Sequence, residues 1–247
     1  MKRFVKFLMQ HPFRRAWGAW GVLLACAALQ GCATVNSPDP RDPLEAMNRS
    51  VFEFNDAVDR AVLKPVATVY KEDLPGWTRT GIGNFFSNLD DVWSVVNHAL
   101  TLRGEAFANS LGRVVINSTL GLGGVLDMAS DLDIEKRSAN FNITLARWGV
   151  DAGPYVVVPI LGPFTLRELA ALPVDRQGNL VNQIGNDATR LGLNVVSAVD
   201  VRAALLGAEG VINQAALDRY SFIRDSYIQR QRYMVFDGNP PDDVPQE

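Results

Sequence analysis

Apolar residues recur at intervals of three and four along most of the chain, which is the spacing of an amphipathic helix. The first such run follows Asp42, whose carboxylate can cap free amides, and Pro43, which suits a first helical position. Its apolar positions are Met47, Val51, Phe54, Val58 and Val62. The pattern predicts one helix from residue 42 to Pro65, where proline stops or kinks it.

The same spacing predicts further helices along the rest of the chain. They cover residues 75–89, 91–102, 103–120, 139–148, 165–172, 187–207 and 210–236. Asp90 is placed as the cap of the second of these, and residues 121–124, rich in glycine, are expected to turn. We find no internal repeat and no second domain, so the prediction is one all-α domain.

Residues 153–165 break this pattern, because glycine-proline pairs flank a run of valines. Such a segment predicts a short β-hairpin or an irregular apolar loop. This segment lies within residues 152–166, which form the longest stretch after the N-terminal region that has no charged residue. Glycines and prolines interrupt that stretch, so we expect no membrane-spanning helix there or elsewhere in the mature chain.

The N-terminal region has the pattern of a secretory signal. A basic segment precedes the uncharged run 16–30, which is shorter than the roughly 20 apolar residues of a spanning helix. The run ends in Leu29, Gln30, Gly31 and Cys32, which resembles a bacterial lipobox with cleavage after Gly31 and acylation of Cys32. Ordinary signal cleavage beside a free cysteine is the alternative. Because Ala33 is not aspartate, the outer membrane is the expected address.

These features divide the chain into four segments. They are a signal peptide (1–31), a tether rich in polar residues and proline (32–41), a helical domain (42–236) and a disordered tail (237–247). The signal carries five of the 24 basic residues and none of the 27 acidic ones, so the mature net charge is −8. That balance argues against nucleic acid as a partner. Acylation of Cys32 leaves no cysteine for a disulfide.

The sequence predicts no catalytic residue, metal site or cofactor. Ser110 lies in the segment 108–112 (ANSLG), which faintly resembles a nucleophile elbow, but a helix is expected there instead of a strand-to-helix turn. His98 is the only histidine left after processing and is interpreted as structural. A Ser–His hydrolase remains the minor alternative. The acidic residues 131–135 lack the spacing of a calcium loop and are expected to be a solvated turn.

The apolar segment near residue 160 stands beside charged residues. Its candidate site residues are Tyr155, Val157, Pro159, Leu161, Phe164, Arg167 and Glu168. The simpler interpretation buries this segment in a core. In an acylated protein, an apolar wall beside charge also suits a phospholipid, which joins apolar tails to a charged head group.

Motifs along nearly the whole mature chain resemble the MlaA (VacJ) lipoprotein family. They include residues 42–49 (DPLEAMNR), 52–55 (FEFN), 63–67 (LKPVA), 84–89 (NFFSNL), 117–124 (NSTLGLGG) and 153–155 (GPY). The resemblance implies a helical ring in the periplasmic leaflet of the outer membrane, with an amphipathic channel. It also implies removal of mislocalised phospholipids from the outer leaflet, transfer to a soluble periplasmic carrier, MlaC, and association with trimeric porins.

A passive lipid channel is therefore the leading hypothesis, with no covalent step. The candidate gate consists of the 155–164 segment and four residues of the first predicted helix, Phe52, Glu53, Phe54 and Asn55. The alternative is a structural adaptor that tethers porins or envelope machinery without moving lipid.

Overall fold

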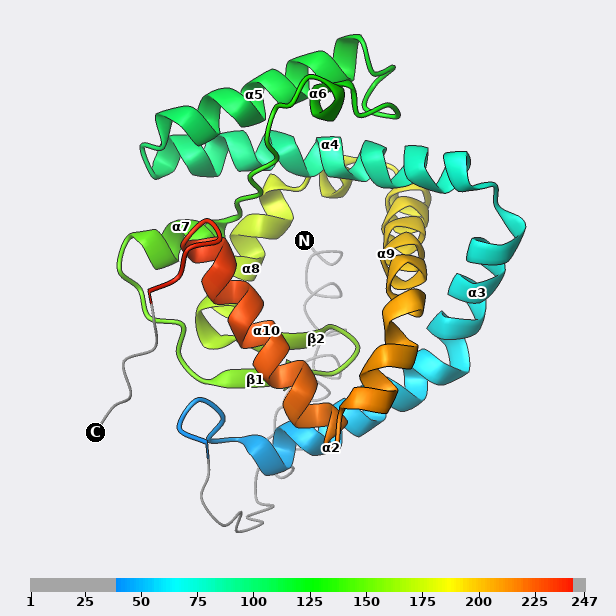
Figure 1. Cartoon of the computed structure of the whole chain (residues 1–247), viewed down its shortest axis with the longest axis vertical. Coiled ribbons are helices and arrows are strands. Elements are labelled where there is room, and N and C mark those ends of the chain that lie inside the picture. Colours follow the sequence, from blue (N-terminus) through cyan, green and yellow to red (C-terminus); the bar gives the residue numbers. More distant parts are fainter. Residues whose placement is uncertain (1–38, 242–247) are drawn as a thin grey trace, which may run out of the picture.

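The structure is a computed structural model that describes residues 39–241, except for the side chains of 211–215. Figure 1 shows its helices arranged as a ring around a central opening. Gly31 and Cys32, the predicted cleavage and acylation sites, lie outside the described residues, as does most of the predicted tether. The expected all-α ring is confirmed, and its one sheet within the described residues is the two-stranded pair β1–β2.

The first helical segment is longer than predicted. α2 (Glu45–Val58) continues through a π-helical segment, η2 (Asp59–Leu63), into α3 (Lys64–Asp73). The predicted stop at Pro65 is wrong, because Pro65 occupies the first turn of α3 and the wider turns of η2 precede it. Asp42 is not the helix cap either. Leu44 takes that position, and the Asp42 carboxylate accepts a hydrogen bond from Asn48 Nδ2 at 2.7 Å.

α4 (Gly76–Leu100) is one continuous helix and runs antiparallel to α5 (Gly104–Thr119), as Figure 1 shows. The predicted break at Asp90 is wrong. The next residue, Asp91, is 1% exposed and pairs with Arg113 of α5 at 3.2 Å. Arg113 also binds Asp127 at 2.9 Å, and Asp127 caps the short helix α6 (Met128–Asp131). Asp91, the neighbour of the predicted cap Asp90, therefore belongs to a buried ion network.

The glycine-rich segment after α5 forms the predicted turn. Gly124 has φ +94°, and a Cβ there would come within 2.6 Å of the Asn88 side chain. At Gly121 a Cβ would approach the Leu126 carbonyl to 2.2 Å. Only glycine fits either position, which brings this turn directly against α4.

The second half of the chain contains the predicted hairpin. α7 (Phe141–Arg147) leads to β1 (Tyr155–Val158) and β2 (Gly162–Thr165), which pair antiparallel. α8 (Leu166–Gly178), a 3-10 segment η3 (Leu180–Gln183) and α9 (Asp187–Ala215) follow. The final helix, α10 (Arg219–Val235), is shorter than predicted, because Asp218 caps it and Gly210 belongs to α9.

Ion pairs between the first and last described helices close the ring. Arg49 of α2 binds the Asp218 carboxylate at 2.5 Å, and Arg219 pairs with Asp56 of α2. Asp237, the first residue of the predicted tail, lies in a turn and pairs with Arg147 of α7 at 2.8 Å.

Instead of one large core, the described residues contain two small apolar clusters. Ala67, Val199 and Ala203 pack between α3 and α9, while Tyr155, Val157 and Tyr220 pack between the hairpin and α10. Large apolar side chains remain exposed outside these clusters. The most exposed of these include Leu102, Trp77, Ile160, Leu122, Leu191 and Leu120. Exposed apolar surface of this extent is typical of membrane or partner contact.

One helix among the described residues, Asp187–Gly210 within α9, is long and apolar enough to cross a membrane by length and composition alone. Only 11% of its most apolar window is buried in the protein. The prediction that the mature chain contains no helix of this kind is therefore wrong by the criteria of length and composition. Asp200 and Arg202 interrupt the uncharged run in sequence, but both have partners: Asp200 accepts from Tyr70 at 2.8 Å and Arg202 pairs with Asp59 at 2.8 Å.

Candidate functional site

A cavity of about 740 Å³, hereafter the lumen cavity, lies among elements that surround the central opening. It is lined by Leu161 of the hairpin turn, Arg176 and Gln177 of α8, Asn182 and Gln183 of η3, and Arg190 and Asn194 of α9. All but Leu161 are polar. The lumen cavity is therefore lined mostly by polar side chains, two of them arginines, while many large apolar side chains are exposed elsewhere on the described residues.

The two arginines of the lumen cavity differ in their partners. Arg190 pairs with Asp187 at 2.5 Å and donates to the Ile184 carbonyl at 3.1 Å. The Arg176 guanidinium makes no ion pair with any residue in 39–241, although its backbone carbonyl accepts a hydrogen bond from Asn182 at 3.1 Å. Arg176 is thus an exposed cation that can bind an anionic group entering the cavity.

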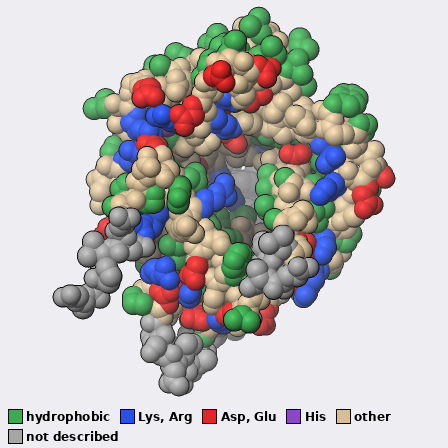
Figure 2. All heavy atoms as spheres, viewed as in Figure 1, with side chains coloured by type: hydrophobic (Ala, Val, Ile, Leu, Met, Phe, Trp, Pro, Cys, Tyr) green, Lys and Arg blue, Asp and Glu red, His purple; other side chains and the backbone are tan. Residues whose placement is uncertain are grey.

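The opening is amphipathic. Figure 2 shows a hollow at the centre of the ring, with basic side chains at one margin and hydrophobic side chains over α9 at the other. On α9, Val201 and Leu205 are more than half exposed, at 58% and 56%. An opening with these two kinds of margin can contact both parts of an amphiphile.

Two asparagines of α2 hold the hairpin in place. Asn48 is fully buried; its Nδ2 donates to the Tyr155 carbonyl at 3.0 Å and its Oδ1 accepts from the Val157 amide at 2.8 Å. Asn55 Nδ2 donates to the Val158 carbonyl at 3.0 Å, and its Oδ1 accepts from the Ile160 amide at 2.7 Å. The hairpin turn, which reaches the lumen cavity, is thereby fixed relative to α2.

The structure separates the predicted gate residues into two groups. Phe52, Tyr155 and Val157 line a separate cavity of about 170 Å³. Phe52 meets the Tyr220 ring edge-on at 5.6 Å, and both hairpin residues are buried. Phe164 is partly buried in β2 opposite Val156. The exposed residues are Glu53, Phe54, Pro159 and Leu161. Of all the predicted gate residues, only Leu161 lines the lumen cavity.

Arg167 and Glu168, the predicted charged pair, lie at the start of α8 and away from the residues of the lumen cavity. Arg167 is 9% exposed; it donates to Asn142 Oδ1 at 2.9 Å and to the Val150 carbonyl at 2.7 Å. Burial lowers the pKa of Arg167. For Glu168, burial and the nearby Asp175 carboxylate raise the pKa to about 7, and Tyr227 of α10 donates to the Glu168 carboxylate. Both residues join α8 to neighbouring elements.

Ser110 and His98 both lie beside one main-chain oxygen. His98 Nε2 is 2.8 Å from the Arg137 carbonyl, and Ser110 Oγ is 3.5 Å from the same oxygen. Both side chains are 1% exposed, and burial lowers the pKa of His98. With Nε2 carrying the hydrogen for that carbonyl, the imidazole cannot accept a proton from Ser110 through this nitrogen.

The described residues contain no group of three or more His, Cys, Asp or Glu side chains that could hold a metal ion. The acidic segment 131–135 is a helix end followed by irregular chain, as expected for a solvated turn.

A family model described as "MlaA lipoprotein" matches residues 40–234, almost the entire described part of the chain. The chain belongs to the MlaA lipoprotein family.

Relatives and a solved structure agree with this membership. The intermembrane phospholipid transport system lipoprotein MlaA of Haemophilus influenzae is 33% identical over 242 residues, which cover 91% of this chain and 96% of that protein. The MlaA of Escherichia coli K12 is 30% identical, covering 87% of each chain. A structure from work on the "Structural basis for maintenance of bacterial outer membrane lipid asymmetry" is 33% identical, with a TM-score of 0.69, and covers 80% of this chain and 99% of that one.

For this MlaA family protein, sequence reasoning missed most of the lumen cavity. The polar residues Arg176, Gln177, Asn182 and Gln183 fall between the predicted helices 165–172 and 187–207, where no element or role was predicted. The available signal was the density of arginine, asparagine and glutamine between residues 176 and 194. Polar residues at that density in a lipoprotein can line a passage as well as face bulk water.

Proposed function

We propose that this protein is a passive channel that removes mislocalised phospholipids from the outer leaflet of the outer membrane and so maintains lipid asymmetry. The observation that carries the proposal is the lumen cavity, a polar and cationic space inside a ring with an apolar exterior. The names of the MlaA relatives and of the solved structure support phospholipid transport as the function.

The lumen cavity can lower the main barrier to lipid movement, which is the loss of water from the head group. A charged head group that enters hydrocarbon loses its hydration, which costs several kcal/mol or more when nothing replaces the water. In this ring, the Arg176 guanidinium and the side-chain amide of Gln177 offer donors in place of water. The acyl chains can stay in contact with apolar surface while the head group moves.

Location and anchoring follow from the same reasoning. We place the ring in the periplasmic leaflet, anchored by acyl chains on Cys32 after removal of residues 1–31. Each buried methylene of such a chain contributes about 0.8 kcal/mol to membrane binding. The lipobox pattern and the family description as a lipoprotein support this placement.

The channel needs partners that set its direction, because a passive conduit follows the gradient that is maintained around it. The family resemblance supports two: a soluble periplasmic carrier of the MlaC kind, which takes up the phospholipid, and trimeric porins, which hold the ring in the membrane. No covalent step is part of this mechanism. The shared hydrogen-bond acceptor of His98 and Ser110 argues against a hydrolase at that position.

The structural adaptor is the alternative function, and the names of the relatives do not favour it. The two functions differ in one measurable property. An adaptor tolerates changes of the charged residues inside the ring. A channel depends on those charges, so the same changes impair it.

The experiment exchanges the lumen charge. Arg176→Glu introduces a carboxylate that repels a phosphate, and Arg230→Glu is its matched control, since both arginines are exposed and neither has an ion pair within residues 39–241. In cells that depend on this protein, we expect Arg176→Glu to raise outer-leaflet phospholipid and detergent sensitivity, while Arg230→Glu leaves both unchanged. Equal behaviour of the two variants at equal protein levels would contradict the channel.

A further inference from the structure

A second cavity, of about 310 Å³, lies between α4 and α9 and is almost wholly apolar. We refer to it as the side pocket. Its main walls are Trp77, Ile82, Phe85 and Phe86 of α4 and Leu193 and Val196 of α9. Gly81 allows the glycine-rich turn to close one end, because a Cβ there would stand 2.9 Å from Val125 Cγ1. Its volume is at the lower end of ordinary ligand pockets.

The side pocket and the lumen cavity share one helix. Asn194 of α9 lines the lumen cavity, and its neighbour Leu193 lines the side pocket. Arg190, one turn earlier, is also in the lumen cavity. Successive residues of a helix differ by about 100° in direction, so the two cavities occupy adjacent faces of α9. One molecule can therefore reach both around the side of a single helix.

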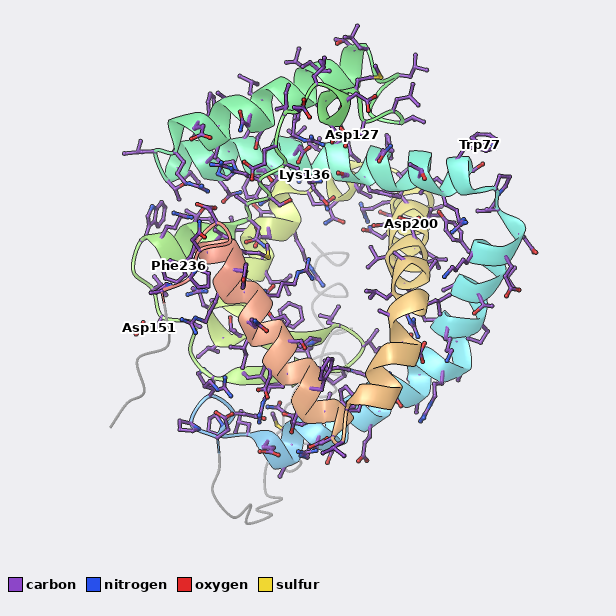
Figure 3. All side chains as sticks on the ribbon, viewed as in Figure 1. Trp77, Asp127, Lys136, Asp151, Asp200 and Phe236 are labelled. Carbon is purple, nitrogen blue, oxygen red and sulfur yellow. The ribbon has the colours of Figure 1, made fainter. Side chains whose placement is uncertain are left out.

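The side pocket is accessible from outside the ring. Trp77 is 79% exposed, and Figure 3 shows it at the end of α4 away from the central opening. Val196 is 38% exposed. An open apolar pocket with a tryptophan at its rim suits hydrocarbon contact near the boundary between lipid and water.

We propose that the side pocket binds one acyl chain of the phospholipid whose head group occupies the lumen cavity. This inference rests on the proposed function. The occupant is identified by complementarity: an anionic head group matches Arg176, which has no ion pair within residues 39–241, and an apolar chain matches the side pocket one helix face away. The lipid is then held across α9 during its passage, with head and tail in separate compartments.

Photo-labelling tests this arrangement in the full chain, reconstituted in vesicles of phosphatidylethanolamine and phosphatidylglycerol. A diazirine analogue of leucine replaces Leu193 in one sample and Leu191 in another; Leu191 is 65% exposed on the same helix and is not in the side pocket. We expect a phospholipid adduct at position 193 that falls about tenfold when Arg176→Glu is added. The adduct at position 191, which reports general lipid contact, is expected to stay unchanged.

Three results would overturn the proposal. They are no acyl adduct at position 193, an adduct that Arg176→Glu leaves unchanged, and an adduct that mass spectrometry assigns to the acyl chains on Cys32. The first excludes an acyl occupant, the second shows only contact with bulk lipid, and the third makes the protein's own anchor the occupant.

A blocking variant separates this proposal from the proposed function. Leu193→Trp fills the side pocket and is expected to slow phospholipid transfer to a soluble carrier about tenfold, whereas Leu191→Trp does not. Circular dichroism verifies that both variants are folded. If Leu193→Trp transfers normally while Arg176→Glu does not, the acyl-chain site is wrong and the channel stands. If both transfer normally, the proposed function fails.

Discussion

Replacing Asn48 with alanine tests whether the contact between α2 and the hairpin holds this part of the ring together. The Asn48 side chain is fully buried and makes three hydrogen bonds, to Asp42 Oδ1 at 2.7 Å, the Tyr155 carbonyl at 3.0 Å and the Val157 amide at 2.8 Å. Alanine leaves three buried polar groups without this partner. A buried group that loses its hydrogen bond costs about 1–3 kcal/mol. Because the Asp42 carboxylate keeps Tyr220 and Arg224 as partners, the two backbone groups dominate, and we expect a loss of about 2–6 kcal/mol.

This loss is large for a folded domain, whose free energy of unfolding is typically about 5–15 kcal/mol. At about 2–4 °C per kcal/mol for a chain of this size, the unfolding midpoint should fall by about 4–24 °C. The assay is thermal unfolding in mild detergent, followed by circular dichroism. Ser50→Ala is the control: Ser50 is exposed on the same helix, and its replacement should change stability by less than about 0.5 kcal/mol.

The same variant has a functional consequence, because the hairpin turn carries Leu161 into the lumen cavity. We expect Asn48→Ala to reduce phospholipid transfer at temperatures where it is still folded, while Ser50→Ala transfers normally. An Asn48→Ala midpoint within about 1 °C of the parent chain would refute the reasoning, since it would mean that the three buried groups find other partners.

Three further variants test other parts of the structure. Arg113→Met removes the partner of the buried Asp91 carboxylate and should destabilise the chain by about 3–5 kcal/mol in the same unfolding assay. Burial and Asp175 raise the pKa of Glu168 from 4.5 to about 7, so this group favours the folded state most below pH 4.5 and its contribution falls as the pH rises to 7. Glu168→Gln removes this pH dependence. The unfolding midpoint of the variant minus that of the parent chain should therefore increase from pH 4 to pH 8. A difference that stays constant over this range would contradict the pKa shift. Cys32→Ala, which carries no acyl chains, should still partition into membranes through the apolar surface of the ring. A variant that stays freely soluble in a flotation assay would contradict membrane binding by that surface.

The positions of the helices were largely predictable from the sequence, and their ends were not. Apolar spacing predicted helical structure across α4, but Asp90 was interpreted as a cap. The partner of the adjacent Asp91 is Arg113, 22 residues away and on another helix. A local pattern cannot distinguish a capping carboxylate from one with a tertiary partner. The hairpin, by contrast, was predictable because glycine and proline act locally on the backbone.

Of the residues predicted for the site, only Leu161 lines the lumen cavity. Tyr155 and Val157 drew attention as apolar residues beside charges, and the structure buries both. Arg176, which lies between two predicted helices, and Asn194, which lies within the predicted helix 187–207, line the lumen cavity, but no role was predicted for either. Their importance depends on the closure of the ring, which brings α8, η3 and α9 around one space, and helical periodicity carries no information on closure.

The most direct test of the channel is transfer of a labelled phospholipid from vesicles that contain the acylated protein to a soluble periplasmic carrier. The account predicts transfer well above that of protein-free vesicles, unchanged by Arg230→Glu and reduced about tenfold by Arg176→Glu. Transfer no faster than from protein-free vesicles, with a carrier that is competent to load, would contradict it.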